Sequence, residues 1–209
     1  MTKIKICGLT DVREAAYLRE AAVDYAGMVL FFPKSKRNIP VAQAEQIMQA
    51  LGDSVQKVAV VVSPSLEQVR AIEAAGFDIL QIHGAVEDSL LQQIRIPFWR
   101  AFNGDNMQEI ERFRSMNGCT GYVFDAPQPG SGQVFDWSQI PERGMSQKLS
   151  VLAGGLHAQN VSEAVRQAAP DVVDVSSGVE YTDRSGKDPE RIRAFVDAVR
   201  RVSLGTLSE

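Results

Sequence analysis

Residues 151–178 read VLAGGLHAQNVSEAVRQAAPDVVDVSSG, and the rest of the chain repeats the pattern that they contain. Two short apolar runs, Val151–Ala153 and Val172–Val175, lie on either side of an amphipathic stretch. Within that stretch, Asn160 and Glu163 have the spacing of a helix capping box. A strand, a helix and a second strand in this order predict a βα unit with parallel strands.

Short apolar runs recur along the whole chain. Most are continuous rather than alternating, which is typical of parallel strands covered on both faces. Their starts lie roughly 20 to 30 residues apart, about the length of a βα unit. The eight runs are Ile4–Cys7, Tyr25–Phe31, Val58–Val62, Ile79–Ile82, Phe98–Phe102, Tyr122–Phe124, Val151–Ala153 and Val172–Val175.

Amphipathic stretches fill the gaps between these runs. Leu66, Val69 and Ile72 share one helical face, and Gly76 is placed to cap the end of that helix. Asp188 followed by Pro189 predicts an N-cap with proline at the first helical position. The gaps therefore predict about eight helices.

Eight strands that alternate with helices either close into a barrel or lie open in a doubly wound sheet. The count of eight favours the barrel, and 209 residues lie near the lower size limit of that fold. No linker or low-complexity stretch divides the chain. We predict an α/β fold in which residues 1–209 form a single-domain (β/α)8 TIM barrel.

The bulk composition excludes several classes of protein. The formal net charge of -4 gives no reason to expect a nucleic-acid partner or a basic membrane-binding face. The two cysteines are far apart and predict neither a disulfide framework nor a zinc site. The opening MTKIKICG is too short an apolar stretch for a signal peptide, and no segment predicts a membrane span. We expect a cytoplasmic enzyme.

Small residues follow the last two predicted strands. Gly154 and Gly155 follow one of them, and Ser177 and Gly178 follow the other. Such residues let backbone N–H groups approach a phosphate, and the loops after strands seven and eight are the usual phosphate site of these barrels. Tight turns are the alternative, but they explain both pairs at these two places less well. We predict phosphate binding here.

A thiol and a carboxylate end two other strands. Cys7 closes the first strand, where it is either a small buried hydrophobe or a base whose thiolate abstracts a proton. Asp125 follows the sixth strand, where it either starts a turn or forms an acid–base pair with the thiol. Asp125–Trp137 is rich in Pro and Gly and predicts a loop, and Cys119, at the start of a strand, reads as structural.

Basic residues follow the second strand. Lys34, Lys36 and Arg37 are either solvated charges or, for Arg37, a two-pronged clamp for a carboxylate. His83 follows the fourth strand, where it is either a polar cap or part of the site.

Motifs in the same order as these strand ends resemble the phosphoribosylanthranilate isomerase family. They cover nearly the whole chain, and KICG, QIHG, AGGL and SSGVE are together highly specific. The matching stretches are KICGLT, FFPKSKR, DILQIHG, GSGQVFDW, LAGGL, DVSSGVE and GKD.

The resemblance implies an Amadori rearrangement of N-(5-phosphoribosyl)anthranilate to 1-(2-carboxyphenylamino)-1-deoxyribulose 5-phosphate in tryptophan biosynthesis. It implies that Asp125 is the general acid that opens the furanose ring and that Cys7 is the general base at sugar C2. Asp125 must then carry a proton near neutral pH, so we expect its pKa above about 3.9. Cys7 must be available as thiolate, so we expect its pKa below about 8.5, or a readily lost proton.

The resemblance also implies the binding residues. Arg37, His83 and Asp174 match positions that bind the substrate, with Arg37 and Asp174 toward the anthranilate end. An aldose-to-ketose shift moves protons without net electron transfer, so we expect no cofactor and no metal. The expected partner is a small phosphorylated substrate, with the chain a monomer or a homodimer.

Two alternatives remain at this stage. One is a different phosphosugar enzyme such as indole-glycerol-phosphate synthase, whose catalytic lysine and glutamate motifs we do not find here. The other is a barrel that only binds phosphate or a partner protein. The presence of both Cys7 and Asp125 argues against this second alternative.

Overall fold

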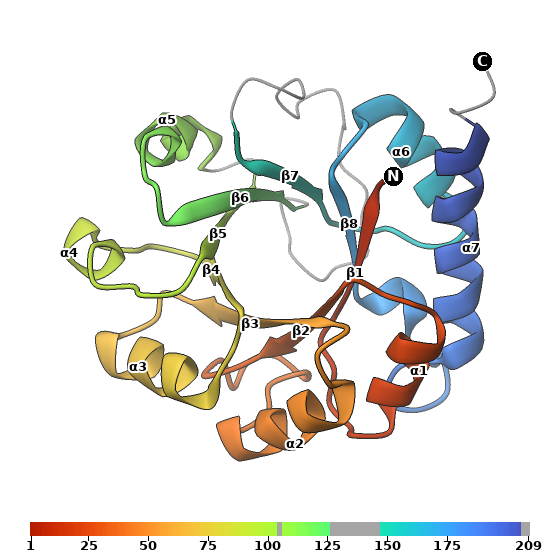
Figure 1. The fold of residues 1–209 in the computed structure, drawn as a ribbon, viewed down its shortest axis with the longest axis horizontal. Helices are drawn as coiled ribbons and strands as arrows, with labels where there is room; N and C mark the ends of the chain where they lie inside the picture. Colours follow the sequence, from red (N-terminus) through yellow and green to blue (C-terminus); the bar gives the residue numbers. More distant parts are fainter. Residues whose placement is uncertain (104–105, 126–146, 206–209) are drawn as a thin grey trace.

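The computed structural model describes residues 1–103, 106–125 and 147–205 of the chain. Eight parallel strands form a closed barrel in which strands that are consecutive in the sequence are neighbours in space (Figure 1). The ring closes where β8 pairs with β1, with Val173 opposite Ile4. The predicted (β/α)8-barrel fold is confirmed.

All eight predicted strands are present, and their ends lie close to those expected. Four strands differ from the prediction by two or three residues at one end: β2 ends at Val29, before Phe31 with its φ of 56°, and β3, β6 and β7 begin earlier, at Gln56, Cys119 and Leu149. The earlier starts were missed because polar or small residues near them pair in the barrel without belonging to an apolar run. The strands are β1 Lys3–Cys7, β2 Tyr25–Val29, β3 Gln56–Val62, β4 Ile79–His83, β5 Phe98–Phe102, β6 Cys119–Phe124, β7 Leu149–Leu152 and β8 Val172–Val175.

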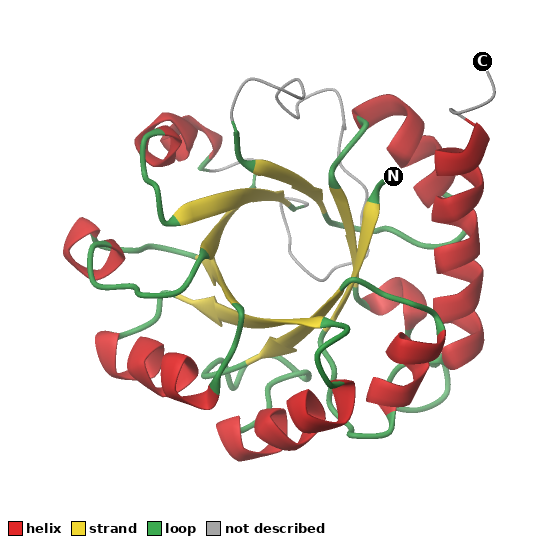
Figure 2. Ribbon diagram, in the orientation of Figure 1, coloured by secondary structure: helices red, strands yellow, loops and turns green. Residues whose placement is uncertain are grey.

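Helices surround the barrel on its outside (Figure 2). Most of the chain between β6 and β7, including the predicted loop from residue 126 on, lies outside the described residues. No helix in the described ranges is both long and apolar enough to cross a membrane. The described α-helices are α1 Glu14–Glu20, α2 Val41–Leu51, α3 Leu66–Ala75, α4 Asp88–Leu91, α5 Ile110–Arg114, α6 Val161–Ala168 and α7 Pro189–Gly205, and the 3-10 helices are η1 Met107–Glu109 and η3 Ser177–Val179.

The predicted helix ends are partly right. Gly76 caps α3 in a left-handed conformation with a φ of 85°, and Asp188 Oδ1 accepts the Glu190 N–H at the start of α7. The capping box at Asn160 is wrong, since the Asn160 side chain does not cap α6. It bonds backward instead, accepting from the His157 N–H and donating to the Gly155 carbonyl, and thereby braces the glycine loop after β7.

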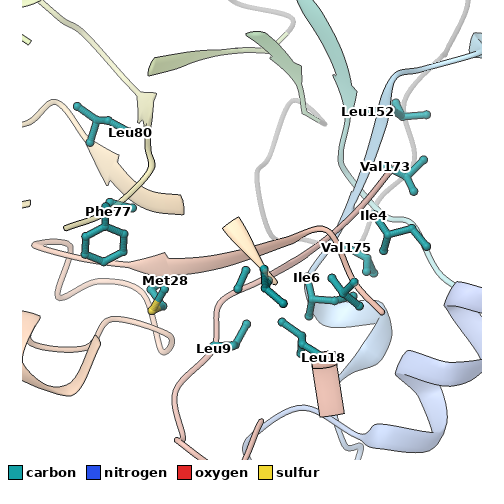
Figure 3. Close-up of a cluster of buried hydrophobic side chains, with 14 of the residues drawn as sticks. Ile4, Ile6, Leu9, Leu18, Met28, Phe77, Leu80, Leu152, Val173 and Val175 are labelled. Carbon is teal, nitrogen blue, oxygen red and sulfur yellow. The ribbon is translucent and has the colours of Figure 1, made fainter. Parts of the chain in front are cut away.

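Two apolar layers explain why the strand sequences are continuous rather than alternating. On β3, Ala59 and Val61 face the helices, whereas Val58 and Val60 face the barrel interior. Figure 3 shows part of the outer layer, with Ile6 on β1 and Leu18 on α1. The interior layer contains Tyr25, Val58, Val60, Ile79, Trp99, Ala101, Val123, Val151, Ala153 and Val172.

Aromatic side chains fill the barrel near the amino ends of the strands. Trp99 is fully buried and meets Tyr25 edge to face, with ring centroids 5.1 Å apart. Gly121 makes room for it, because a Cβ at Gly121 would lie 2.7 Å from the indole Cδ1 atom. This end of the barrel is therefore solid, and open space remains at the carboxyl ends of the strands.

Candidate active site

A pocket opens at the carboxyl ends of the strands. Eight of the nine residues predicted for the site line it, and Gly178 lies just behind. Gln81 and Ser176 line it as well. The predicted residues in its wall are Cys7, Arg37, His83, Asp125, Gly154, Gly155, Asp174 and Ser177.

Cys7 ends β1 with its thiol beside the backbone of β2. A Cβ built on Gly27 would lie 2.9 Å from Cys7 Sγ, so only glycine leaves room for the thiol at this point. Gly8 follows with a φ of 79°, and its N–H bonds the Gly27 carbonyl, which fixes the turn out of the strand. The two cysteines differ as predicted, since Cys119 is fully buried at the amino end of β6.

Below the thiol lies a buried ion pair that the sequence analysis did not single out. Lys5 Nζ donates to Asp174 Oδ2 at 2.7 Å, and the side chains are 0% and 7% exposed. Asp174 Oδ1 is also buried and has no hydrogen-bond partner in the described part of the chain. The available signal was a lysine inside the apolar run KIKIC, two residues before Cys7 and thus on the same face of the strand.

The charges around Cys7 shift the pKa of its thiol in opposite directions. Burial raises the pKa of its thiol, the Lys5 ammonium lowers it, and Asp174 raises it again. The pKa of Cys7 lies above its ordinary value as a result, so of the two expectations for Cys7 the lowered pKa is wrong, and the readily lost proton stays a prediction. The physical reason is desolvation at the barrel mouth, which disfavours the thiolate more than the nearby lysine favours it.

Asp125 follows β6 and faces the same pocket as Cys7. Its backbone N–H bonds the Phe102 carbonyl at 2.9 Å, which continues the ladder between β5 and β6 and fixes where the side chain leaves the barrel. The structure thus brings together the thiol and the carboxylate that lie 118 positions apart in the sequence.

Two turns with exposed backbone amides form another side of the pocket. Gly154 and Gly155 have φ values of 85° and 64°, a left-handed conformation that favours glycine. Within the described residues, the amides of Gly155 and Ser177 donate no hydrogen bond to the protein. Amide donors in this arrangement suit an anion with several oxygens, such as a phosphate.

Gly178 acts from behind this wall. A Cβ on Gly178 would lie 2.1 Å from the Leu156 carbonyl oxygen and 3.1 Å from His157 Cα. The loops after β7 and β8 therefore touch through backbone atoms, and a side chain at this position would force them apart. Gly178 therefore sets the distance between the two loops, because only a residue without a side chain fits there.

Arg37 is held by a carboxylate that the sequence analysis quoted only as part of a motif. Its Nε donates to Glu180 Oε1, while its alkyl chain crosses Gly8, where a Cβ would lie 2.3 Å from Arg37 Cδ. Lys187 Nζ also donates to Glu180 Oε1 at 3.0 Å, and Lys36 Nζ donates to Oε2 at 2.8 Å. The terminal amino groups of Arg37 make no hydrogen bond within the described ranges, so they remain available to a ligand.

This cluster predicts an acid-dependent loss of stability. Burial alone would raise the pKa of Glu180, but the Arg37 hydrogen bond and the Lys187 charge outweigh it and lower that pKa to about 2. The folded pKa lies below the unfolded value of about 4.3, so the stabilisation is complete above that pH and is lost as the pH falls toward 2. We expect wild type to exceed Glu180→Gln in free energy of unfolding at pH 7, and the difference to shrink toward pH 3.

Urea titrations from pH 7 to pH 3 measure this difference. Glu45→Gln is the matched control, since Glu45 is exposed on α2 and removal of its charge should change stability little at any pH. A difference between wild type and Glu180→Gln that stays constant over this range would contradict the assignment.

His83 is half-buried at the end of β4 and lines the pocket. Gln81 Nε2 and His83 Nε2 are 2.8 Å apart, and burial, with the charges of Lys5 and Arg100, lowers the pKa of His83 to about 4. The imidazole is therefore neutral near pH 7. Gln81 Oε1 is buried without a hydrogen-bond partner in the described part of the chain.

No group of three or more His, Cys, Asp or Glu side chains among the described residues is arranged to hold a metal ion. The pocket instead offers a thiol, carboxylates, a neutral imidazole, a guanidinium and free amides. Because these groups meet at the carboxyl ends of the strands, where barrels of this kind carry their chemistry, the chain is a (β/α)8-barrel enzyme.

Comparison with known proteins identifies the family. Residues 4–198 match the family described as N-(5'phosphoribosyl)anthranilate (PRA) isomerase. A relative from Streptococcus mutans named N-(5'-phosphoribosyl)anthranilate isomerase is 38% identical over 203 residues, which cover 96% of this chain and 100% of the relative. The chain therefore belongs to the N-(5'-phosphoribosyl)anthranilate isomerase family.

Solved structures agree with this result. Monomers of the dimeric phosphoribosylanthranilate isomerase from Thermotoga maritima superimpose with a TM-score of 0.82 at 33% identity, covering 96% of this chain and 100% of that one. A phosphoribosyl anthranilate isomerase in complex with reduced 1-(o-carboxyphenylamino)-1-deoxyribulose 5-phosphate gives a TM-score of 0.82 at 32% identity, with the same coverage.

Proposed function

We propose that this chain converts N-(5'-phosphoribosyl)anthranilate to 1-(2-carboxyphenylamino)-1-deoxyribulose 5-phosphate in tryptophan biosynthesis, with Asp125 as general acid and Cys7 as general base. The observation that carries the assignment is that both side chains line one pocket at the carboxyl end of the barrel. Family membership supplies the reaction, and the pocket supplies groups suited to each of its proton transfers.

The reaction needs only proton movements. Asp125 donates a proton to the furanose ring oxygen, the C1–O bond breaks, and the nitrogen lone pair forms a Schiff base. Cys7 thiolate then takes the proton from C2, and the C–H electrons flow through C1 toward nitrogen to give an enolamine. In the tautomerisation C1 gains a proton while the C2 hydroxyl loses one and becomes the ketone, and the proton held by Cys7 returns through solvent to Asp125. Atoms and electrons therefore balance without an oxidant or reductant.

The remaining predicted residues bind the substrate in this proposal. The amides of Gly154, Gly155 and Ser177 hold the phosphate, and Gly178 keeps their two loops together. The free amino groups of Arg37 pair with the anthranilate carboxylate.

Asp174 and His83 contact the substrate deeper in the pocket. In this proposal the unpaired Oδ1 of Asp174 accepts the amino N–H of the anthranilate. His83 acts as a neutral hydrogen-bonding group, consistent with its pKa of about 4.

A fluorescence assay tests the proposed reaction. Purified protein should remove the fluorescence of the anthranilate substrate at a rate proportional to enzyme concentration. A barrel that only binds its ligand would leave the fluorescence constant after an initial change equal to the enzyme present. Constant fluorescence after the initial change would contradict the proposed function.

Inorganic sulfate and phosphate are expected to compete with the substrate. The anion should lie over Gly154–Gly155 and Ser177–Gly178, because backbone amides without a partner in the described residues line the pocket there. Steady-state inhibition and a crystal soaked in sulfate measure this. An anion bound elsewhere, with this position empty, would contradict it.

A glycine variant sharpens this test. Gly178→Ala places a Cβ against the Leu156 carbonyl, so the two loops must separate, and we expect anion affinity to fall by about tenfold or more. Gly52→Ala is the control, because a Cβ there meets nothing within 4 Å although the φ of 66° still costs stability. Equal anion affinities in the two variants would remove Gly178 from this role.

We also infer that residues 1–209 work as one catalytic domain, as a monomer or a homodimer in the cytoplasm. A dimeric relative supports a homodimer, and a small phosphorylated substrate is the partner that the pocket suits. Light scattering after size-exclusion chromatography distinguishes the two oligomeric states.

A further inference from the structure

Lys5 is a buried cation that takes part in none of the proton transfers proposed above. It lies on β1 two residues before Cys7, so both side chains point into the barrel. Its side chain is 0% exposed, although lysine is almost never fully buried without a partner. A charge in such a place calls for an explanation beyond packing.

Lys5 lies between an anion and the thiol. Its Nζ is 2.7 Å from Asp174 Oδ2 on one side. On the other side, a Cβ built on Gly27 would lie 3.1 Å from Lys5 Nζ and 2.9 Å from Cys7 Sγ, so ammonium and sulfur lie against the same patch of β2 backbone. Asp174 therefore holds the ammonium in place beside the sulfur.

We propose that Lys5 is a positioning residue that stabilises the thiolate of Cys7, and that Asp174 is the counter-ion that keeps Lys5 charged. The consequence for turnover rests on the proposed role of Cys7 as base, whereas the effect on the thiolate does not. Because Lys5 does not line the pocket, it acts through the sulfur.

The protonation of Lys5 agrees with this role. Burial lowers the pKa of Lys5, but Asp174 and Cys7 together raise it by more. The net pKa therefore lies above its ordinary value, and the side chain remains an ammonium. One carboxylate balances its charge in the resting pocket, and a thiolate is the second anion that the same cation can stabilise.

Other charged groups near Cys7 are accounted for. Lys187 lowers the pKa of Cys7 less than Lys5 does, and its Nζ bonds the Ser176 carbonyl and Glu180. His83 is neutral near pH 7, as its pKa of about 4 shows. The remaining ionisable groups of the pocket wall are Asp125 and Arg37, the latter paired with Glu180.

The thiol pKa can be measured without substrate. In a Cys119→Ala background, Cys7 is the single cysteine, and its rate of alkylation by iodoacetamide as a function of pH reports its thiolate fraction. In this background we compare Lys5→Met, Asp174→Asn and the Lys5→Met/Asp174→Asn double variant. Lys3→Met is the matched control, since it removes a lysine from the exposed start of the same strand.

We expect shifts of opposite sign. Lys5→Met should raise the thiol pKa by about one pH unit or more, and Asp174→Asn should lower it, because each removes a charge of opposite sign. The control should leave it unchanged. The double variant leaves no buried charge unpaired, so it remains informative if Lys5→Met does not fold, and its thiol pKa should exceed that of Asp174→Asn.

Equal thiol pKa values in the presence and absence of Lys5, in both backgrounds, would overturn the proposal. Shifts of the same sign for Lys5→Met and Asp174→Asn would also overturn it. Turnover of Lys5→Met separates this effect from the general-base role, because its kcat should fall with the thiolate fraction while KM changes little. A shifted thiol pKa with unchanged kcat would keep the thiolate effect and reject Cys7 as base.

Discussion

Cys7→Ser is expected to lower kcat by about 10²- to 10⁴-fold, the usual contribution of a general base. Serine nearly preserves the size of the side chain, so the packing against Gly27 should survive and the fold should stay intact. Its hydroxyl is a far weaker acid than a thiol, and the variant therefore lacks an anion able to take the C2 proton. Steady-state turnover and thermal unfolding of the same preparation measure both effects.

The second cysteine provides the control for this substitution. Cys119→Ser makes the same chemical change at a fully buried site at the amino end of β6. It should cost stability, because a hydroxyl replaces a thiol in an apolar environment, and leave turnover nearly unchanged. More than about a tenth of wild-type turnover in Cys7→Ser would remove Cys7 from the proposed role.

Asp125→Asn should remove most turnover and spare binding. The amide keeps the size of the carboxyl group but cannot donate the proton that opens the furanose ring. The proposed phosphate and carboxylate contacts lie elsewhere in the pocket, so the affinity for a product analogue should change much less than kcat. Titration with the analogue and turnover across pH separate the two quantities.

A surface aspartate controls for loss of charge. Asp53→Asn removes one negative charge from the exposed link between α2 and β3, far from the strand ends that carry the site, and should leave kcat unchanged. An Asp125→Asn enzyme with near-normal turnover would defeat the acid–base assignment.

The same pair predicts a bell-shaped dependence of turnover on pH. The acidic limb requires Cys7 as thiolate, and the basic limb requires Asp125 as acid. Since burial raises the pKa of Cys7 in the structure, only a small fraction of the enzyme carries the thiolate near neutral pH. The two limbs belong to the coupled pair, and Asp125→Asn should abolish the basic one.

Local sequence determined the strands and several helix ends. Continuous apolar runs mark strands buried on both faces, so all eight could be placed from composition and spacing alone. The predicted caps at Gly76 and Asp188 were correct because each residue interacts with the backbone of its own helix end. The capping box predicted at Asn160 was wrong because its side chain can hydrogen-bond either to the first turn of the helix or to the glycine loop. The geometry of the loop favours the second set of hydrogen bonds.

Most of the pocket wall was also within reach of the sequence. In a parallel barrel every strand ends on the same side, so Cys7, Asp125 and Gly154–Gly155 meet in space once the strands are assigned. This inference needs only strand order, which the sequence carries.

Tertiary structure alone decided how the groups in the pocket affect one another. Two ion pairs, Lys5 with Asp174 and Arg37 with Glu180, each join residues more than 140 positions apart in the sequence. The raised pKa of Cys7 and the lowered pKa of His83 depend on burial and on distances of a few ångströms. The sequence by itself determined which groups reach the barrel mouth, whereas their charge states follow from desolvation and Coulomb interactions that exist only after the strands have closed.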